Sequence, residues 1–142
     1  MRDLDRFAKD LANYRPVRRP DLTDDIVADY PDITLHELFI NAVIHRNYDG
    51  STTPVSINHY SDRIEIQNPG SLYGDLTKAQ FSGGGTAYRN PVLAEAAKTL
   101  GFANRFGRGI ALAKDRLRKN GSPDLEYVVG ENHLAVIVWK RT

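Results

Sequence analysis

The sequence predicts an α+β fold, a two-layer sandwich in which helices cover one face of a mixed, mostly antiparallel sheet. Two observations predict it. Strand-like runs occur as neighbouring pairs and do not alternate strictly with helices. The helical pattern over residues 34–47 is apolar around most of its circumference, so it needs a sheet to cover it.

Composition fits one compact domain and excludes several kinds of site. The chain has 142 residues, of which 41% are hydrophobic and 26% charged, and its net charge is +1. This charge gives no case for nucleic-acid or membrane binding. The absence of cysteine excludes disulfides, thiolate metal sites and thiol nucleophiles. Without a bilayer-length apolar run or a signal-peptide pattern, we expect a cytoplasmic protein.

Residues 1–30 are expected to form a helical extension and linker before the main domain, residues 31–142. The stretch "LDRFAKDLANY" places four apolar residues on one helical face. They are Leu4, Phe7, Leu11 and Tyr14. The stretch "YRPVRRPD" is basic and broken by prolines, which predicts a solvated linker. The stretch "LTDDIVADYPD" predicts a short helix or turn.

Two hairpins and two more helices are predicted downstream. Alternating apolar residues over 55–59 and 64–66 indicate a hairpin, and "LEYVV" with "HLAVIVWK" indicates a second. A helix is expected from Pro91 to Gly101, the usual punctuation of a helix. Another follows the glycine turn in "FGRGIALAKDRLRKNG".

A polar stripe runs along the helix predicted over 34–47. Glu37, Asn41 and His45 recur every four residues and fall within an arc of about 80°. Each has a structural explanation: Thr34 and Glu37 match a capping box, Asn41 fits a buried amide, and His45 fits a structural histidine. The three together favour one wall of a binding cavity.

The chemistry of this stripe fits phosphate better than zinc. A carboxylate such as Glu37 can orient or deprotonate a water, and the amide oxygen of Asn41 suits Mg²⁺. The turn Gly107-Arg108-Gly109 precedes a helix and could present N–H groups to phosphates. The turn Asn68-Pro69-Gly70 ends a strand and is typical of a proline-containing β-turn.

In this order, the motifs resemble the Bergerat ATP-binding fold of DNA gyrase, the heat-shock chaperone, sensor histidine kinases and the MutL repair protein. The stretches "HELFINAVIHRNY", "DRIEIQNPGSL", "YRNPVL" and "NRFGRGI" more closely resemble one branch, the RecG-like C-terminal domains of predicted transcriptional regulators. The resemblance covers about Tyr30 to Trp139. It implies ATP and Mg²⁺ as cofactors, a lid from Ser71 to Arg105, and an upstream domain of the same regulator.

The resemblance also implies residue roles. Glu37 matches the acid that activates water, and Asn41 matches the Mg²⁺ ligand that bridges the ATP phosphates. Asn68 stands where most members have an Asp that accepts from the adenine amino group, and its amide oxygen can accept in the same way. The other cofactor-binding candidates are His45, Gly70, Arg89, Asn90, Gly107, Arg108 and Gly109. Arg46 and Tyr88 match the motifs of the narrower branch without an assigned role.

Two functions remain open at this point: a slow Mg²⁺-dependent ATPase, or a degenerate module that binds nucleotide or dimerises without turnover. A protein kinase ranks last, because no phosphoacceptor helix pair is present and Glu37 would have no purpose in a phosphotransferase. No G-x-x-x-x-G-K-[ST] loop occurs, which excludes a P-loop helicase motor. Expected partners are a nucleotide, the upstream domain and a second copy. We do not expect direct DNA contact, because "RPVRRP" and "KDRLRKN" fit solvated surfaces, and we expect no membrane contact.

Overall fold

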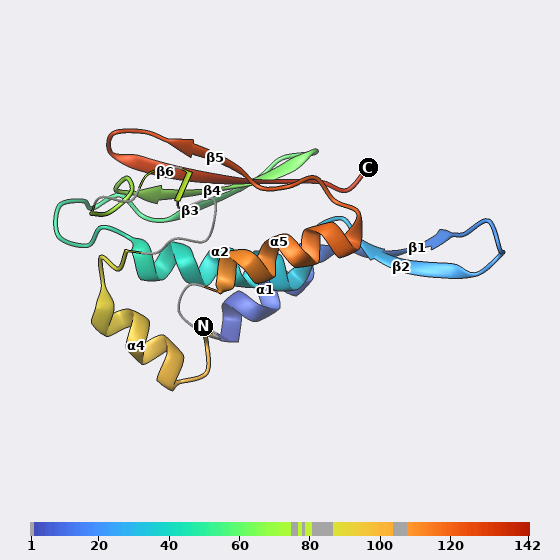
Figure 1. Cartoon of the computed structure of the whole chain (residues 1–142), viewed down its shortest axis with the longest axis horizontal. Helices are drawn as coiled ribbons and strands as arrows, with labels where there is room; N and C mark the ends of the chain where they lie inside the picture. The colour runs from blue at the N-terminus through green and yellow to red at the C-terminus, as the bar shows by residue number, and fades with distance from the viewer. Residues whose placement is uncertain (1, 75–76, 78, 81–86, 104–107) are drawn as a thin grey trace.

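The computed structural model describes residues 2–74, 77, 79–80, 87–103 and 108–142, and confirms the α+β two-layer sandwich (Figure 1). The described helices are α1 (Arg2–Ala12), α2 (Asp32–His45), α4 (Pro91–Thr99) and α5 (Gly109–Asn120). The described strands are β1 (Tyr14–Arg18), β2 (Asp24–Ala28), β3 (Ser56–His59), β4 (Arg63–Pro69), β5 (Glu126–Val129) and β6 (His133–Trp139). Both downstream hairpins and both helices lie where the sequence predicts them.

The main sheet has the strand order β3-β4-β6-β5, and all of its described pairs are antiparallel. Opposed residues lie on the same face of a sheet, so one apolar row crosses all four strands. It consists of Ile57, Ile66, Val136 and Tyr127. This row faces α1, α2 and α5, which cover one side of the sheet (Figure 1). Within the described part of the chain, no helix is long and apolar enough to cross a membrane.

Helix α2 lies between the sheet and the other helices, as its broad apolar surface requires. Leu35, Leu38 and Phe39 are buried in the main core with residues of α5 and the sheet. The Thr34 hydroxyl donates a 3.0 Å hydrogen bond to the Ala113 carbonyl of α5. The residue that caps the start of α2 is Pro31, and it makes no side-chain cap. The capping box therefore does not form, and it does not explain Glu37.

The N-terminal segment corrects the sequence interpretation. Helix α1 ends at Ala12, so Tyr14 begins a strand and does not share the helical face. The expected linker and the expected short helix are strands β1 and β2, which pair as a separate ribbon projecting from the body (Figure 1). Ion pairs join the strands at Arg18–Asp24 (2.7 Å) and Arg19–Asp25 (2.5 Å). An edge strand tolerates a proline, so the prolines in this stretch did not exclude a strand.

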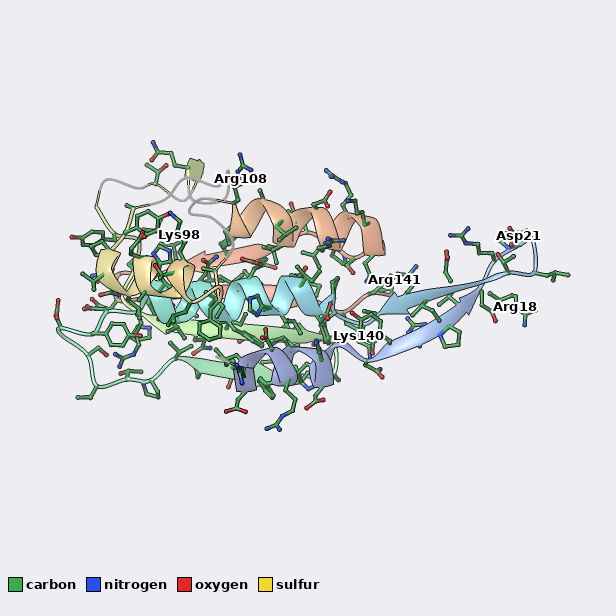
Figure 2. The ribbon with its side chains drawn as sticks, turned by 90° about the horizontal axis from the view of Figure 1, so that it is seen from below. Arg18, Asp21, Lys98, Arg108, Lys140 and Arg141 are labelled. Atoms are coloured by element: carbon green, nitrogen blue, oxygen red, sulfur yellow. The ribbon has the colours of Figure 1, made fainter. Side chains whose placement is uncertain are left out.

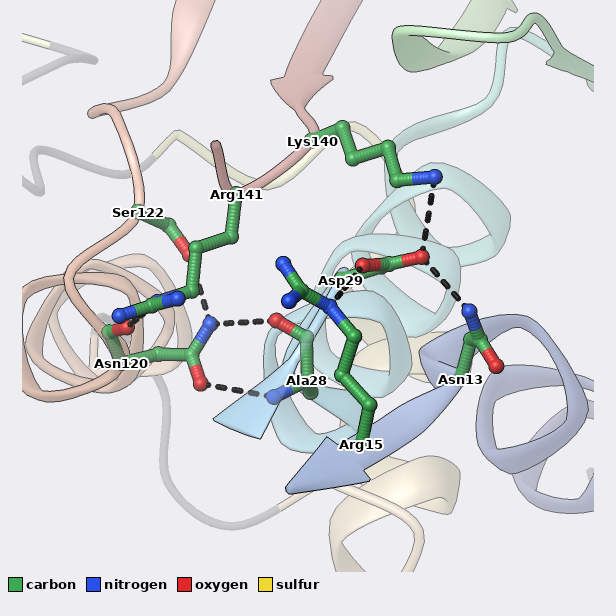
Figure 3. A network of polar contacts seen from close by, with 8 residues as sticks. All are labelled: Asn13, Arg15, Ala28, Asp29, Asn120, Ser122, Lys140 and Arg141. Atoms are coloured by element: carbon green, nitrogen blue, oxygen red, sulfur yellow. Dashed lines mark hydrogen bonds and ion pairs between the residues drawn. The ribbon is translucent and has the colours of Figure 1, made fainter. Parts of the chain in front are cut away.

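The base of the ribbon is held by a buried carboxylate (Figure 3). Asp29 is 3% exposed and accepts from Asn13 Nδ2 at 2.7 Å, Arg15 Nε at 3.2 Å and Lys140 Nζ at 3.0 Å. Burial by itself raises the pKa of this carboxyl, but the three donors outweigh it and hold the pKa below its usual range. Asp29 therefore stays charged and ties β1 and β2 to the C-terminal end of the sheet.

A second contact joins the ribbon to α5. The Asn120 side chain pairs with both backbone groups of Ala28, accepting from its N–H at 3.0 Å and donating to its carbonyl at 2.7 Å. Arg141 Nε in turn donates to the Asn120 carbonyl at 2.5 Å. Figure 2 shows Lys140 and Arg141 at the base of the ribbon and Arg18 and Asp21 toward its tip. The ribbon is thus fixed at one end only.

Replacing Asp29 with Ala is expected to lower the free energy of unfolding by about 1–3 kcal/mol, because Arg15 and Lys140 lose their carboxylate. The pKa of the Asp29 carboxyl is lower in the folded state than in the unfolded state, where it is about 3.9. Its contribution to the free energy of unfolding is therefore complete above a pH of about 3.9 and is lost as the pH falls through the folded pKa. Urea unfolding at neutral and acidic pH measures both effects. The exposed pair is the control: Asp24→Ala should cost less than about 1 kcal/mol. Equal losses for the two variants, or an Asp29 loss that persists unchanged in acid, would contradict this assignment.

Candidate functional site

Two of the three stripe residues meet at the start of α5. Glu37 is only 4% exposed. A Cβ added to Gly109 would lie 2.7 Å from Glu37 Oε2, 3.6 Å from Asn41 Nδ2 and 3.8 Å from Asn41 Oδ1. Any larger residue at Gly109 would therefore displace the carboxylate. The structure brings Glu37, Asn41 and Gly109 together, as the sequence predicts for a phosphate site.

The N-terminal end of α5 has the properties of an anion site. The first N–H groups of a helix have no partner within the helix, and this end carries partial positive charge. The N-cap residue Arg108 makes no side-chain cap, and no acidic residue of α5 occupies its first turn. Arg108 stands directly before the helix (Figure 2). Gly107, the other predicted phosphate-binding glycine, lies outside the described residues, as do parts of the expected lid.

The C-terminal end of α2 is closed by side chains from other segments. The last carbonyls of a helix lack partners within the helix and need donors when they are buried. Three side chains supply them here: Asn68 from β4, Tyr48 from the following loop, and Asn90 from the start of α4. The bonds are Asn68 Nδ2 to Ala42 O (2.9 Å), Tyr48 Oη to Val43 O (2.8 Å), and Asn90 Nδ2 to Ile44 O and Arg46 O (2.7 Å each).

This arrangement explains why residue 68 is Asn. A carbonyl only accepts, so the contact with Ala42 O must be made by the amide nitrogen of Asn68, and the orientation of its amide is fixed. An Asp could not donate this bond and would meet the negative end of α2. The Asn68 Oδ1 atom is buried and has no donor among the described residues. The Asn68 side chain thus keeps one acceptor that no described donor satisfies.

Asn68 and Gly70 line a cavity of about 300 Å³ at the end of β4. Its other walls come from the loop after α2 and the β5–β6 turn, and no Asp, Glu, Lys or Arg contributes to it. Gly70 has φ +90°, and a Cβ there would lie 2.8 Å from Asn47 Cβ. Glu37, Asn41 and Gly109 are not part of this lining. The neutral, amide-rich cavity and the start of α5 are therefore separate places.

His45 does not join Glu37 and Asn41 at Gly109. Its ring stacks on Tyr88, with ring centres 5.8 Å apart and an interplanar angle of 19°. Burial lowers the pKa of His45, and the nearby Arg89 cation lowers it further, so the imidazole is neutral at neutral pH. The stripe thus divides into the pair Glu37 and Asn41 at Gly109 and an aromatic contact one turn further along α2.

Sequence reasoning gave no role to two tyrosines that shape this end of the molecule. Tyr48 closes α2 through its hydroxyl. The Tyr73 ring lies under the Arg89 guanidinium, and its centre is 4.8 Å from Arg89 Cζ. Tyr48 could have been found as a hydroxyl-bearing residue just beyond the helix end. Tyr73 has no such signal, because its contact depends on the path of the chain between residues 70 and 89.

The order of elements and the meeting of Glu37, Asn41 and Gly109 define an ATPase-type domain of the Bergerat class. A comparison with family models makes the assignment narrower. Residues 52–138 match the family described as "Putative ATP-dependent DNA helicase recG C-terminal". The chain belongs to this family.

A solved structure shares the fold. The DIP2311 protein from Corynebacterium diphtheriae superposes with a TM-score of 0.81 at 20% sequence identity, over 97% of this chain. The match spans 28% of that protein's chain, so the present chain corresponds to a small part of it. No curated protein matches the sequence.

Replacing Gly109 with Ala is expected to push the Glu37 carboxylate away from the start of α5 and cost about 1–2 kcal/mol of stability. The matched control is Gly50→Ala, where the nearest atom, Asn47 Nδ2, is 3.7 Å away. Adding Glu37→Ala to Gly109→Ala should recover most of the loss, because the obstructing atom is gone. Thermal unfolding of Gly109→Ala, Glu37→Ala, the double variant and Gly50→Ala measures this coupling, and additive losses would contradict the contact.

Replacing Asn68 with Asp is expected to cost about 1–3 kcal/mol at neutral pH, because the carboxylate cannot donate to Ala42 O. The deficit should narrow as pH falls, since a protonated carboxyl regains a donor. The control is Asn132→Asp in the exposed β5–β6 turn, which should change stability little. Melting curves across the acidic range provide the measurement. A deficit that is the same at every pH would show that the Ala42 bond is not its cause.

Proposed function

We propose that this chain is the nucleotide-binding domain of a transcriptional regulator, and that it binds ATP with Mg²⁺ and hydrolyses it slowly. The observation that carries the proposal is the meeting of the Glu37 carboxylate and the Asn41 amide at Gly109, where α5 begins. Membership of an ATPase-type family supports the same nucleotide class.

The phosphate end of the ligand fits the start of α5. Gly109 has no side chain at the positive end of α5, and Arg108, directly before the helix, adds a positive charge. The Asn41 amide oxygen is the donor that would hold Mg²⁺, which favours oxygen ligands and keeps several waters. The described residues contain no cluster of three or more His, Cys, Asp or Glu side chains, so a zinc-type site is not supported there. When bound, the ion would neutralise charge on the phosphates.

Glu37 is the residue proposed to act on water. A buried carboxylate one helical turn from Asn41 can accept a proton from a water placed for attack on the terminal phosphate. Catalysis in such a site comes mainly from positioning and electrostatics, since phosphoryl transfer needs little covalent help. The exclusion of the capping box supports this role, because no helix-capping function then accounts for Glu37.

The free Asn68 oxygen supports a base with an amino group. Adenine presents a donor where guanine presents a carbonyl oxygen, and a lone buried acceptor discriminates against the latter. Gly70 keeps the backbone beside this acceptor free of a side chain. We therefore assign the base to Asn68, at the end of α2, and the phosphates to the start of α5 at Gly109.

A non-hydrolysing module is the second candidate, since one structure gives binding geometry and not turnover. In either case the proposed partners are an upstream domain and a second copy. Direct DNA contact is not supported, because the basic stretch at Arg15, Arg18 and Arg19 is ion-paired with aspartates of the same ribbon or its base. Pairs of this kind leave little positive potential for a phosphate backbone.

Calorimetry with ATP and Mg²⁺ is expected to show binding that Asn41→Ala weakens by about tenfold or more. Glu37→Ala should keep binding but lower turnover by about a hundredfold or more. Asp24→Ala, on the distant ribbon, is the control for both assays. The absence of binding to the wild-type chain at millimolar nucleotide would overturn the proposal. Binding without any turnover would favour the non-hydrolysing module.

A further inference from the structure

Arg89 is fixed beside Gly70 at the base end of the proposed site. Its Nη2 atom donates to the Ser71 carbonyl at 3.1 Å, and its guanidinium carbon lies 4.8 Å from the centre of the Tyr73 ring. A Cβ added to Gly70 would lie 3.4 Å from the same Nη2 atom. Two contacts therefore hold the guanidinium against a backbone position that has no side chain.

The charge of Arg89 has no protein counter-ion among the residues that the structure describes. None of their carboxylates lies within ion-pair distance of Arg89, and its Nε is buried without an acceptor. Partly buried arginines usually pair with an anion, because removing the charge from water is costly. The arginines of the ribbon follow this rule, whereas Arg89 does not. Its surroundings fit an anion that comes with a ligand.

The neighbouring rings do not supply that anion. His45 stacks on Tyr88, and burial and the nearby Arg89 cation lower the pKa of His45 and disfavour its charged form. The planar guanidinium presents paired donors that match phosphate oxygens, and this geometry distinguishes it from a lysine. Arg89 lies beside Gly70, two residues after the base acceptor Asn68, and none of the atoms nearest to Gly109 belongs to it. The anion that it meets should therefore be close to the base.

We propose that Arg89 binds the sugar-proximal phosphate of a nucleotide whose base lies at Asn68 and whose terminal phosphates lie at the start of α5. This inference rests on the proposed function and adds a contact to it. It gives Arg89 a role in selecting nucleotides over nucleosides, apart from Asn41 and Glu37, which act at the terminal phosphates.

Equilibrium binding of adenosine, AMP and ATP with Mg²⁺ to the full chain tests this role. Arg89→Gln should weaken AMP and ATP on the order of tenfold or more and leave adenosine unchanged. Arg89→Lys should recover part of the loss, because lysine keeps the positive charge but lacks the paired donors of the guanidinium. Inorganic phosphate is a further arm: it should compete poorly with AMP if the ester, and not free phosphate, is the ligand.

Arg46→Gln is the matched control. Its guanidinium also lies over a tyrosine, 4.7 Å from the Tyr48 ring centre, and donates to loop carbonyls at Ser51 and Thr53. Like Arg89, it has no described ion pair, but it does not contact Gly70. Because Ser51 and Thr53 line the cavity at Asn68, this variant should change the affinities for adenosine, AMP and ATP by the same factor.

Three outcomes would overturn the inference: unchanged AMP and ATP binding in Arg89→Gln, an equal weakening of adenosine in Arg89→Gln, or the same selective loss of AMP and ATP in Arg46→Gln. If the wild-type chain binds no nucleotide, the proposed function fails first and this inference fails with it. Should Arg89→Gln not fold, Tyr73→Leu takes its place, because it removes the stacking support and keeps the cation. It should weaken AMP more than adenosine, and equal effects on the two ligands would count against the role.

Discussion

A buried helix end needs donors for its last carbonyls, and at α2 three separate segments provide them. Asn68 comes from the end of β4, Tyr48 from the loop after the helix, and Asn90 from the start of α4. Meeting this one requirement brings the sheet, the loop and the next helix to the same point. The base end of the proposed site is therefore built from the residues that close the helix.

The sequence was informative wherever the pattern is local. The apolar breadth of α2, the alternation of β3 and β4, and the punctuation of α4 and α5 all predicted elements that the structure confirms. The spacing of Glu37 and Asn41 also predicted a shared polar wall. The ribbon was missed because Asp29 joins β1 to Lys140, more than a hundred residues away, and no local pattern reveals such a partner. The choice between cap and site at Glu37 likewise needed the contact of Thr34 with α5.

Local charge in the sequence was a poor guide to charge at the surface. The stretch with Arg15, Arg18 and Arg19 is basic, yet each side chain pairs with an aspartate that folding brings opposite to it. Arg89 stands in a stretch of unremarkable charge, yet no described carboxylate neutralises it. Tertiary pairing decides which cation lacks a carboxylate partner, and a cation without one is a stronger sign of an anionic ligand than a basic run in the sequence.

The two ends of the proposed site differ because they meet opposite ends of two helices. At the start of α5 the helix end is positive, so Gly109 and Asn41 suit phosphates. At the end of α2 the helix end is negative, where a carboxylate is unfavourable and an amide is not. Asn68 therefore donates to the helix with its nitrogen, and its oxygen, which has no described donor, is the acceptor proposed for the base. Asn in place of Asp is thus consistent with adenine recognition, and it is the residue that this helix end requires.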